Sequence, residues 1–132
     1  MRLLVDTDLF IEVLLDQARA IEARNVLANP KGHSLFASDF SVHSIGLLLF
    51  RWKQRQVFRQ FMQDLIAGVG IEMLSLTAPD MENLIEPEVG PNLDFDDTYQ
   101  LVVAVKYGLK IVSFDSDFDR TPEGRLLPAD VL

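Results

Sequence analysis

The sequence has 132 residues, of which 48% are hydrophobic, 20 are acidic and 12 are basic, for a formal net charge of −8. This length and apolar content suffice for one continuous core, so a single domain over residues 1–132 is expected. Cysteine is absent, which excludes disulfides, thiolate metal sites and a cysteine nucleophile; it fits a reducing compartment, and a cytoplasmic protein is expected.

Neither export nor a membrane partner is expected. Charge interrupts the first apolar run at Asp6, too early for the apolar stretch of a signal peptide. The longer apolar runs, such as residues 45–50, fall far short of the roughly 20 residues that a membrane-spanning helix requires.

Short apolar runs alternate with segments whose apolar residues recur at helical spacing. The expected elements, in chain order, are a strand at 3–5, helices at 9–15 and 18–27, a strand at 34–37, helices at 39–50 and 54–67, a strand at 71–76, a short helix with Pro79 in its first turn, a helix at 95–107 and a strand at 110–114. Apolar strands separated by helices predict an α/β fold with three layers, a mainly parallel central sheet flanked by helices.

Turn-forming residues support these boundaries. Proline and glycine within 29–32 and two glycines within 68–70 are typical of chain breaks. Ser38 or Asp39 can cap the helix that follows, and Gly108 can end the helix at 95–107. Residues 86–92 hold two prolines and a glycine and are expected to form a loop.

Acidic residues concentrate directly after strands and at one helix start. Asp6 and Asp8 follow the first strand, and Asp115 and Asp117 follow the last. Three more, Asp94, Asp96 and Asp97, crowd the start of the intervening helix. Because ligand sites of open parallel sheets form beyond the carboxyl ends of the strands, we expect these groups to share one site.

Carboxylates brought together repel one another and retain protons unless a cation lies between them. Hard oxygen ligands favour Mg²⁺ or Mn²⁺ as cofactor. A zinc site is not expected, since the chain has no cysteine and only two histidines, His33 and His43. Helix capping and turn formation are simpler roles for any one of these aspartates, above all for Asp8, Asp94 and Asp117.

The segments Leu3-Leu4-Val5-Asp6-Thr7-Asp8 and Ile111-Val112-Ser113-Phe114-Asp115-Ser116-Asp117-Phe118, with Asp97 on the helix between them, are similar to those of PIN-domain proteins, especially VapC-type toxin ribonucleases. The similarity spans nearly the whole chain. It implies a PIN-like fold, a metal-dependent endoribonuclease, RNA as substrate and an antitoxin protein as partner. By position it makes Asp6, Asp97 and Asp115 the catalytic metal ligands, with Asp8, Asp94 and Asp117 as further candidate ligands and Ser113 in support.

One position departs from that family. The helix after the second strand usually carries a glutamate, and Ser44 stands in its place, next to His43. A hydroxyl brings neither the charge nor the ligating oxygens of a carboxylate, so weaker metal binding is one expectation. A catalytically impaired PIN-like protein-interaction module is therefore the alternative function. Both Ser44 and His43 are treated as supporting residues, although a helix histidine hydrogen-bonded locally is the simpler interpretation for His43.

A third of the basic residues lie within nine positions: Arg51, Lys53, Arg55 and Arg59. Interleaved with aromatic side chains, they are candidates for RNA binding through phosphate contacts and stacking. A solvated helix face is the simpler alternative. The aromatic residues Trp52, Phe58 and Phe61 could equally form a surface for a partner or for a homodimer.

The N-terminal segment also suggests a second class of enzyme. The segment Leu4-Val5-Asp6-Thr7-Asp8-Leu9 resembles the opening of haloacid-dehalogenase-like phosphohydrolases, with Asp6 as nucleophile and Asp8 as acid or base. The signal is short, and the later aspartates follow the PIN order instead.

Overall fold

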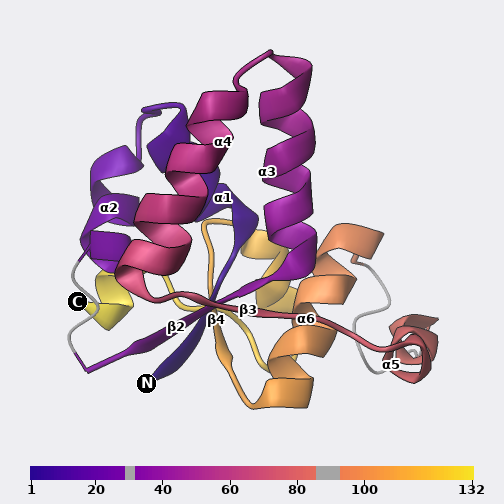
Figure 1. Cartoon of the computed structure of the whole chain (residues 1–132). Coiled ribbons are helices and arrows are strands. Elements are labelled where there is room, and N and C mark those ends of the chain that lie inside the picture. The colour runs from indigo at the N-terminus through magenta and orange to yellow at the C-terminus, as the bar shows by residue number, and fades with distance from the viewer. Residues whose placement is uncertain (29–31, 86–92) are drawn as a thin grey trace.

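The centre of the fold is a four-stranded sheet, seen in a computed structural model that describes residues 1–28, 32–85 and 93–132 (Figure 1). The strand order is β3-β2-β1-β4, and every neighbouring pair is parallel. The strands are β1 (Arg2–Val5), β2 (Ser34–Ser38), β3 (Glu72–Leu74) and β4 (Lys110–Val112). The predicted α/β class with a parallel central sheet is thus confirmed.

Helices connect the strands and cover both faces of the sheet. The α-helices are α1 (Thr7–Leu14), α2 (Ala20–Ala28), α3 (Asp39–Arg51), α4 (Arg55–Phe61), α5 (Ala78–Glu82) and α6 (Phe95–Tyr107). Short 3₁₀ helices span Asn83–Ile85, Ser116–Arg120 and Pro128–Val131. Figure 1 shows α3 and α4 standing side by side above the sheet, with α6 on its other side.

Two apolar clusters form the core, one on each face. Because successive strand residues point to opposite faces, Leu3 and Val5 of β1 join the first cluster and Leu4 joins the second. The first cluster packs α1, α2, α3 and α4 against the sheet, and the second packs α6. This burial on both faces explains why β1, β2 and β4 lack polar alternation, whereas the edge strand β3 is largely exposed.

Several element ends have simple local causes. Ser38 caps α3, because its hydroxyl oxygen accepts a hydrogen bond from the Ser41 amide at 3.1 Å. Thr77 and Asp80 form a capping box at the start of α5, and a proline occupies its first turn. Gly108 ends α6 with φ of 67°, a left-handed conformation that glycine adopts without steric cost.

Some boundaries differ from the prediction. The expected helix at 54–67 divides into α4 and a π-helical segment, Met62–Gly68, whose wider turns lead into β3. After this segment the Ile71 amide donates a hydrogen bond to the Ile66 carbonyl. The strands β3 and β4 are shorter than expected. Ser113 lies just beyond the end of β4, and its amide donates a hydrogen bond to the Leu126 carbonyl. The loop expected at 86–92 lies outside the described residues.

The strand order places the site. From β1 the chain adds β2 and β3 on one side and later returns to add β4 on the other, so the order reverses between β1 and β4. Ligands of open α/β sheets bind beyond the carboxyl ends of the strands at such a reversal. Within the described parts of the chain, no helix combines the length and apolarity needed to cross a bilayer.

Candidate metal centre

Three carboxylates converge at the carboxyl ends of the strands. Asp97, Asp115 and Asp117 each offer one oxygen, and these three oxygens lie within 4.8 Å of one another. Asp97 belongs to the first turn of α6, and Asp115 and Asp117 lie at the start of the 3₁₀ helix after β4. This spacing suits a single cation bound by hard oxygen ligands.

Asp6 lies beside this group and is nearly fully buried. Its Oδ1 accepts hydrogen bonds from the Thr7 amide and from Gln100 Nε2, both at 2.9 Å, and its Oδ2 accepts one from Ser113 Oγ at 2.6 Å. Burial raises the pKa of Asp6, and these donors partly oppose the shift. Three donors fix the orientation of this side chain.

Ser113 links the carboxylates to the backbone. Its fully buried hydroxyl lies 2.6 Å from Asp6 Oδ2 and 3.2 Å from Asp8 Oδ2, and it accepts a hydrogen bond from the Asp115 amide. Asp8 Oδ2 also accepts from the Phe114 amide. Its buried Oδ1 has no hydrogen-bond partner among the described residues. Burial and the neighbouring Asp6 raise the pKa of Asp8 to about 7.

Crowding also affects Asp97. Burial, followed by the charges of Asp115 and Asp94, raises its pKa to about 7. Asp94 has a clear structural role, since its Oδ1 caps α6 by accepting from the Asp97 amide at 3.0 Å. A cation among these groups would relieve the repulsion that raises the pKa.

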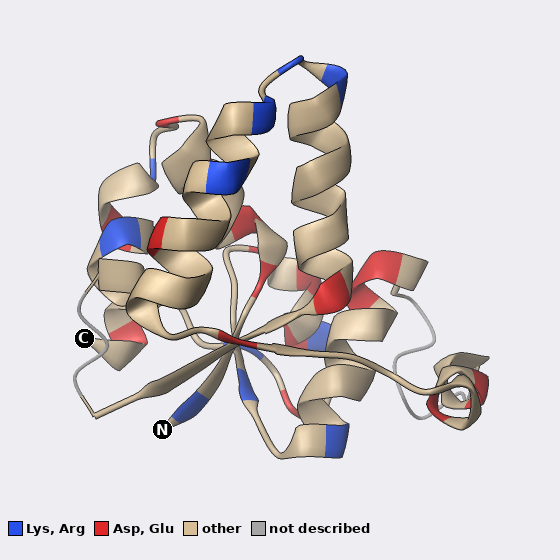
Figure 2. Ribbon diagram, in the orientation of Figure 1, with Lys and Arg blue, Asp and Glu red and all other residues tan. Residues whose placement is uncertain are grey.

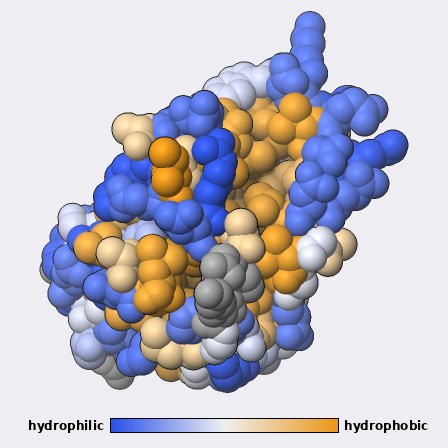
Figure 3. Space-filling model, turned by 90° about the vertical axis from the view of Figure 1, so that its left-hand side faces the viewer, coloured by the Kyte–Doolittle hydropathy of each residue, from blue (hydrophilic) through white to orange (hydrophobic). Residues whose placement is uncertain are grey.

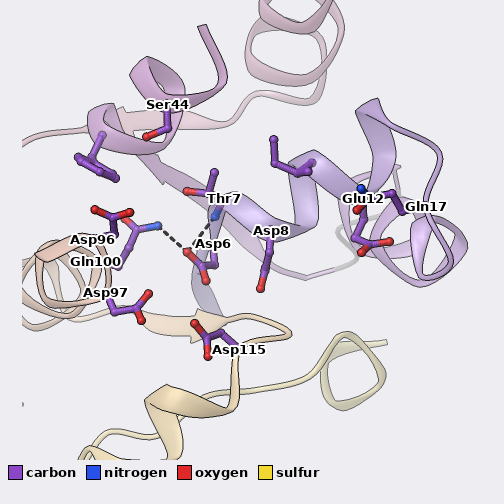
Figure 4. Close-up of a pocket in the computed structure, with 12 residues that line it drawn as sticks. Asp6, Thr7, Asp8, Glu12, Gln17, Ser44, Asp96, Asp97, Gln100 and Asp115 are labelled. Atoms are coloured by element: carbon purple, nitrogen blue, oxygen red, sulfur yellow. Dashed lines mark hydrogen bonds between the residues drawn. The ribbon is translucent and has the colours of Figure 1, made fainter. Parts of the chain in front are cut away.

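The carboxylates open into a pocket of about 320 Å³. Figure 4 shows Asp97 and Asp115 turned toward each other, with Asp6 and Asp8 facing the same space from the end of β1 and the start of α1. Ser44 reaches the pocket from α3. It stands at the position where the sequence comparison with PIN domains led us to expect a glutamate. The lining residues are Asp6, Thr7, Asp8, Ile11, Glu12, Gln17, Phe40, Ser44, Asp96, Asp97, Gln100 and Asp115.

Two groups of predicted residues lie elsewhere. His43 is exposed and lines a different pocket, with Leu47 and Phe58, so the structure does not bring it to the acidic pocket. Arg51, Lys53 and Arg55 lie at the turn between α3 and α4, at the end of α3 remote from Ser44, and Arg59 lies in the last turn of α4 (Figure 2). There the Arg55 guanidinium lies 4.7 Å from the centre of the Phe50 ring.

Sequence reasoning missed three polar residues beside Asp6. Gln100 is 2% exposed, and its Nε2 donates both to Asp6 Oδ1 and to Ser41 Oγ, each at 2.9 Å. Ser41 Oγ lies 2.7 Å from Thr7 Oγ1. A sequence signal existed for Gln100, because it lies one helical turn after Asp97 and is followed by five apolar residues.

The molecule is a parallel α/β fold with an acidic pocket at its topological reversal. The profile of the PIN domain matches residues 3–124, nearly the whole chain. The chain therefore belongs to the PIN domain family. This match favours the PIN order of aspartates over the haloacid-dehalogenase-like alternative. A search of curated protein sequences gave no significant match.

Solved structures share the fold. The chain is similar to VapC20 of Mycobacterium tuberculosis, a sarcin-ricin loop cleaving toxin, with a TM-score of 0.75, 21% identity and coverage of 96% of this chain and 99% of that one. It is similar to a chain of VapBC2 from Rickettsia felis bound to promoter DNA, with a TM-score of 0.72, 13% identity and coverage of 96% and 97%. It is also similar to a chain of a toxin-antitoxin complex from Klebsiella pneumoniae, with a TM-score of 0.68, 20% identity and coverage of 95% of this chain and 96% of that one.

Proposed function

We propose that this protein is an endoribonuclease that requires Mg²⁺ or Mn²⁺ and is the toxin of a toxin-antitoxin pair. The observation that carries the proposal is the convergence of Asp97 and Asp115 with Asp117, whose carboxylate oxygens lie within 4.8 Å of one another. Asp6 lines the same pocket as Asp97 and Asp115. PIN domains are nucleases, and this acidic pocket is the place where such chemistry fits.

The donor set fits a hard divalent ion. Among the residues that the structure describes, every charged group that lines the pocket is a carboxylate, and neither His33 nor His43 lines it. Asp6, Asp97 and Asp115 would hold the ion, with Asp117 in reach. A divalent ion held there supplies charge that polarises a phosphodiester and lowers the pKa of bound water.

The chain's own residues orient the ligands. Gln100 and the Thr7 amide hold one oxygen of Asp6, and Ser113 holds the other. Because Ser113 also contacts Asp8 and the Asp115 amide, the ends of β1 and β4 are fixed relative to each other. Preorganised ligands of this kind need no rearrangement when an ion and a phosphate bind.

RNA is the proposed substrate, and its phosphates need positive charge, which none of the described residues that line the pocket supplies. Four exposed basic residues are proposed to contact the RNA backbone at a distance from the pocket: Arg51, Lys53 and Arg55 at the α3–α4 turn, and Arg59 on α4. A contribution of this kind weakens as salt rises.

An antitoxin protein is the proposed partner. On the side of the molecule where α2 and α4 lie, Figure 3 shows an apolar hollow bordered by hydrophilic residues. Apolar surface of this kind is typical of protein interfaces. Two of the similar structures are described as a VapBC assembly and a toxin-antitoxin complex, which supports the same partner class. A homodimer is an additional proposal, and of the three aromatic residues suggested for its surface only Trp52 is well exposed, at 48%. Phe58 is half-buried, and Phe61 is buried in the core, so the expectation for Phe61 is wrong.

A second candidate function rests on Ser44. Because a hydroxyl faces the pocket where a glutamate was expected, the site has one carboxylate fewer. A PIN scaffold that binds a protein partner without cleaving RNA would follow if the remaining aspartates could not hold an ion.

The test is RNA cleavage by the purified chain. Mixed single-stranded RNAs are incubated with Mg²⁺, with Mn²⁺ and with EDTA, using the wild type and Asp115→Asn. The ribonuclease proposal predicts discrete fragments that require the ion and disappear in the variant. Intact RNA at every ion concentration, with a folded wild-type protein, would support the interaction module instead. A phosphorylated Asp6 would support a phosphohydrolase.

A further inference from the structure

Three aromatic rings form a cluster at the edge of the acidic pocket. The Phe40 ring centre lies 6.0 Å from that of Phe95 and 5.5 Å from that of Tyr99, and Phe95 and Tyr99 are 6.2 Å apart. Phe40 lines the acidic pocket together with Asp96 and Asp97. The cluster is therefore continuous with the candidate metal centre.

The inner part of this cluster is held rigidly. Tyr99 is 5% exposed; its hydroxyl donates to Asp39 Oδ1 at 2.7 Å and accepts from the Leu76 amide at 3.3 Å. Phe40 is half-buried and packs against the apolar cluster that includes Tyr99. Side chains fixed in this way lose little conformational entropy when a ligand binds.

The outer ring is free to make contacts. Phe95 is the first residue of α6, two positions before Asp97, and it is 53% exposed. A large exposed aromatic side chain beside several carboxylates gains little from folding, because much of its apolar surface stays in water. The ring of Phe95 packs against the ring of Phe40, and Phe40 belongs to the wall of the acidic pocket.

We propose that Phe95, backed by Phe40 and Tyr99, is a stacking surface for a nucleobase of single-stranded RNA next to the phosphate at the acidic pocket. The proposal rests on the ribonuclease function proposed above and adds how its substrate is held. Aromatic rings bind successive bases of single strands by stacking, and every base offers a face for it.

The surrounding charge favours a base over a phosphate at this place. Asp94 and Asp96 flank Phe95 in the sequence, and both are exposed, so they repel the RNA backbone. Stacking requires no positive charge and can contribute affinity here. The ribose-phosphate that carries the stacked base would then extend into the pocket, where a bound ion offsets the negative charge.

The test compares RNAs with and without bases. Binding of short oligo(A), oligo(U) and an abasic ribose-phosphate oligomer of equal length is measured by fluorescence anisotropy, with Ca²⁺ as the ion and strand integrity checked on gels. Phe95→Leu should weaken oligo(A) binding about tenfold and leave binding of the abasic oligomer unchanged. Phe95→Trp should retain the tight binding of oligo(A). Val105→Ala is the control, since Val105 is 57% exposed on the same helix and should have no effect.

The outcomes separate this proposal from the one it rests on. If the wild type binds oligo(A) and Phe95→Leu changes oligo(A) and the abasic oligomer equally, or changes neither, the stacking surface is refuted while the ribonuclease proposal stands. If the wild type neither binds nor cleaves any RNA, both are refuted, and Phe95 would be a candidate contact for a protein partner. Thermal unfolding of each variant establishes that the comparison is between folded proteins.

Discussion

The acidic pocket and the basic α3–α4 turn lie on opposite ends of α3 and differ in how their side chains are held. In the pocket, Asp6 accepts three hydrogen bonds and Ser113 is fully buried, so each group depends on its neighbours. At the turn, Arg51, Lys53 and Arg55 are exposed. The cation–π contact of Arg55 with Phe50 is the kind of isolated surface contact that contributes little to stability.

This difference has a functional meaning. A site that binds an ion needs fixed oxygens, because misplaced ligands lose affinity steeply, and the pocket has such a network. A surface that attracts a polyanion needs only charge, because phosphate contacts add with little geometric demand. We therefore expect substitutions in the pocket to have large, residue-specific effects and substitutions at the turn to have small, additive ones.

The largest effect is expected for Asp97→Asn. Loss of a group that merely orients a metal ligand typically costs about 10- to 100-fold, so loss of a ligand should lower metal-dependent RNA cleavage by at least about a hundredfold. Because burial and neighbouring charges raise the pKa of Asp97 to about 7, its charged form destabilises the metal-free fold. The metal-free variant should therefore unfold at a higher temperature than the wild type above pH 7.

The sign of this effect provides its control. The folded-state pKa of Asp97 lies above its ordinary value of 3.8, so the penalty grows as pH rises between these values and is absent below both. The stability difference should vanish in acid. Asp64→Asn, an equal exchange of an exposed residue on the π-helical segment, should change neither cleavage nor the pH dependence. Full activity of Asp97→Asn would contradict the assignment.

Gln100→Met tests whether the hydrogen-bond network matters beyond the ligands. The exchange keeps the length of the side chain and removes the donor to Asp6 and Ser41. Metal affinity, measured by calorimetric titration of Mn²⁺, should fall by about 10- to 100-fold. Thr98→Val is the matched control, because it removes a buried hydroxyl from the same helix, and among the described residues that hydroxyl bonds only to the Asp94 carbonyl. Equal losses in both variants would indicate a general packing defect.

Ser44→Glu should act in the opposite direction and more weakly. A carboxylate at this lining position adds charge and ligating oxygens, so Mn²⁺ should bind severalfold more tightly and raise the melting temperature more than in the parent. Without metal the extra charge should lower that temperature, because it adds repulsion. Ser44→Gln supplies the same size without charge as a control. Unchanged affinity and unchanged metal-induced stabilisation in the glutamate variant would show that Ser44 is not at a ligand position.

The smallest effect is expected at the basic turn. Replacing Arg51, Lys53 and Arg55 by glutamine should leave the turnover of bound RNA unchanged and weaken RNA binding modestly. For single strands, the slope of log affinity against log salt should decrease by about 0.7 for each phosphate that the variant no longer neutralises. Binding measured over a range of salt checks this. A weakening that does not depend on salt would indicate stacking or shape recognition instead of charge.

Most of the fold could be predicted from the sequence, because the signals for helices and strands are local. Apolar runs, Gly108 and the cap at Ser38 determine where elements begin and end without reference to distant residues. The π-helical segment was not predictable, since its wider turns depend on how α4 packs before β3. The aspartates that follow strands could be predicted as metal ligands, because the carboxyl ends of parallel strands lie at a common edge of the sheet.

The hydrogen-bond network around Asp6 could not be predicted from the sequence, because it joins residues that are far apart in the chain. Gln100 contacts Ser41 and Asp6 across 59 and 94 positions of the chain, and only the packing of α6 against α3 and β1 brings them together. The exposure of His43 has a similar origin. Adjacent helix residues point in directions about 100° apart, so Ser44 faces the pocket while His43 faces another surface.

The most direct test of the central claim is a crystal structure of the protein with Mn²⁺, in which anomalous scattering locates the ion. We predict a peak in the acidic pocket, within coordination distance of carboxylate oxygens of Asp97 and Asp115, and its loss in crystals of Asp115→Asn. A protein crystallised with saturating Mn²⁺ that shows no ion between these carboxylates, or one bound only elsewhere on the surface, would contradict the account.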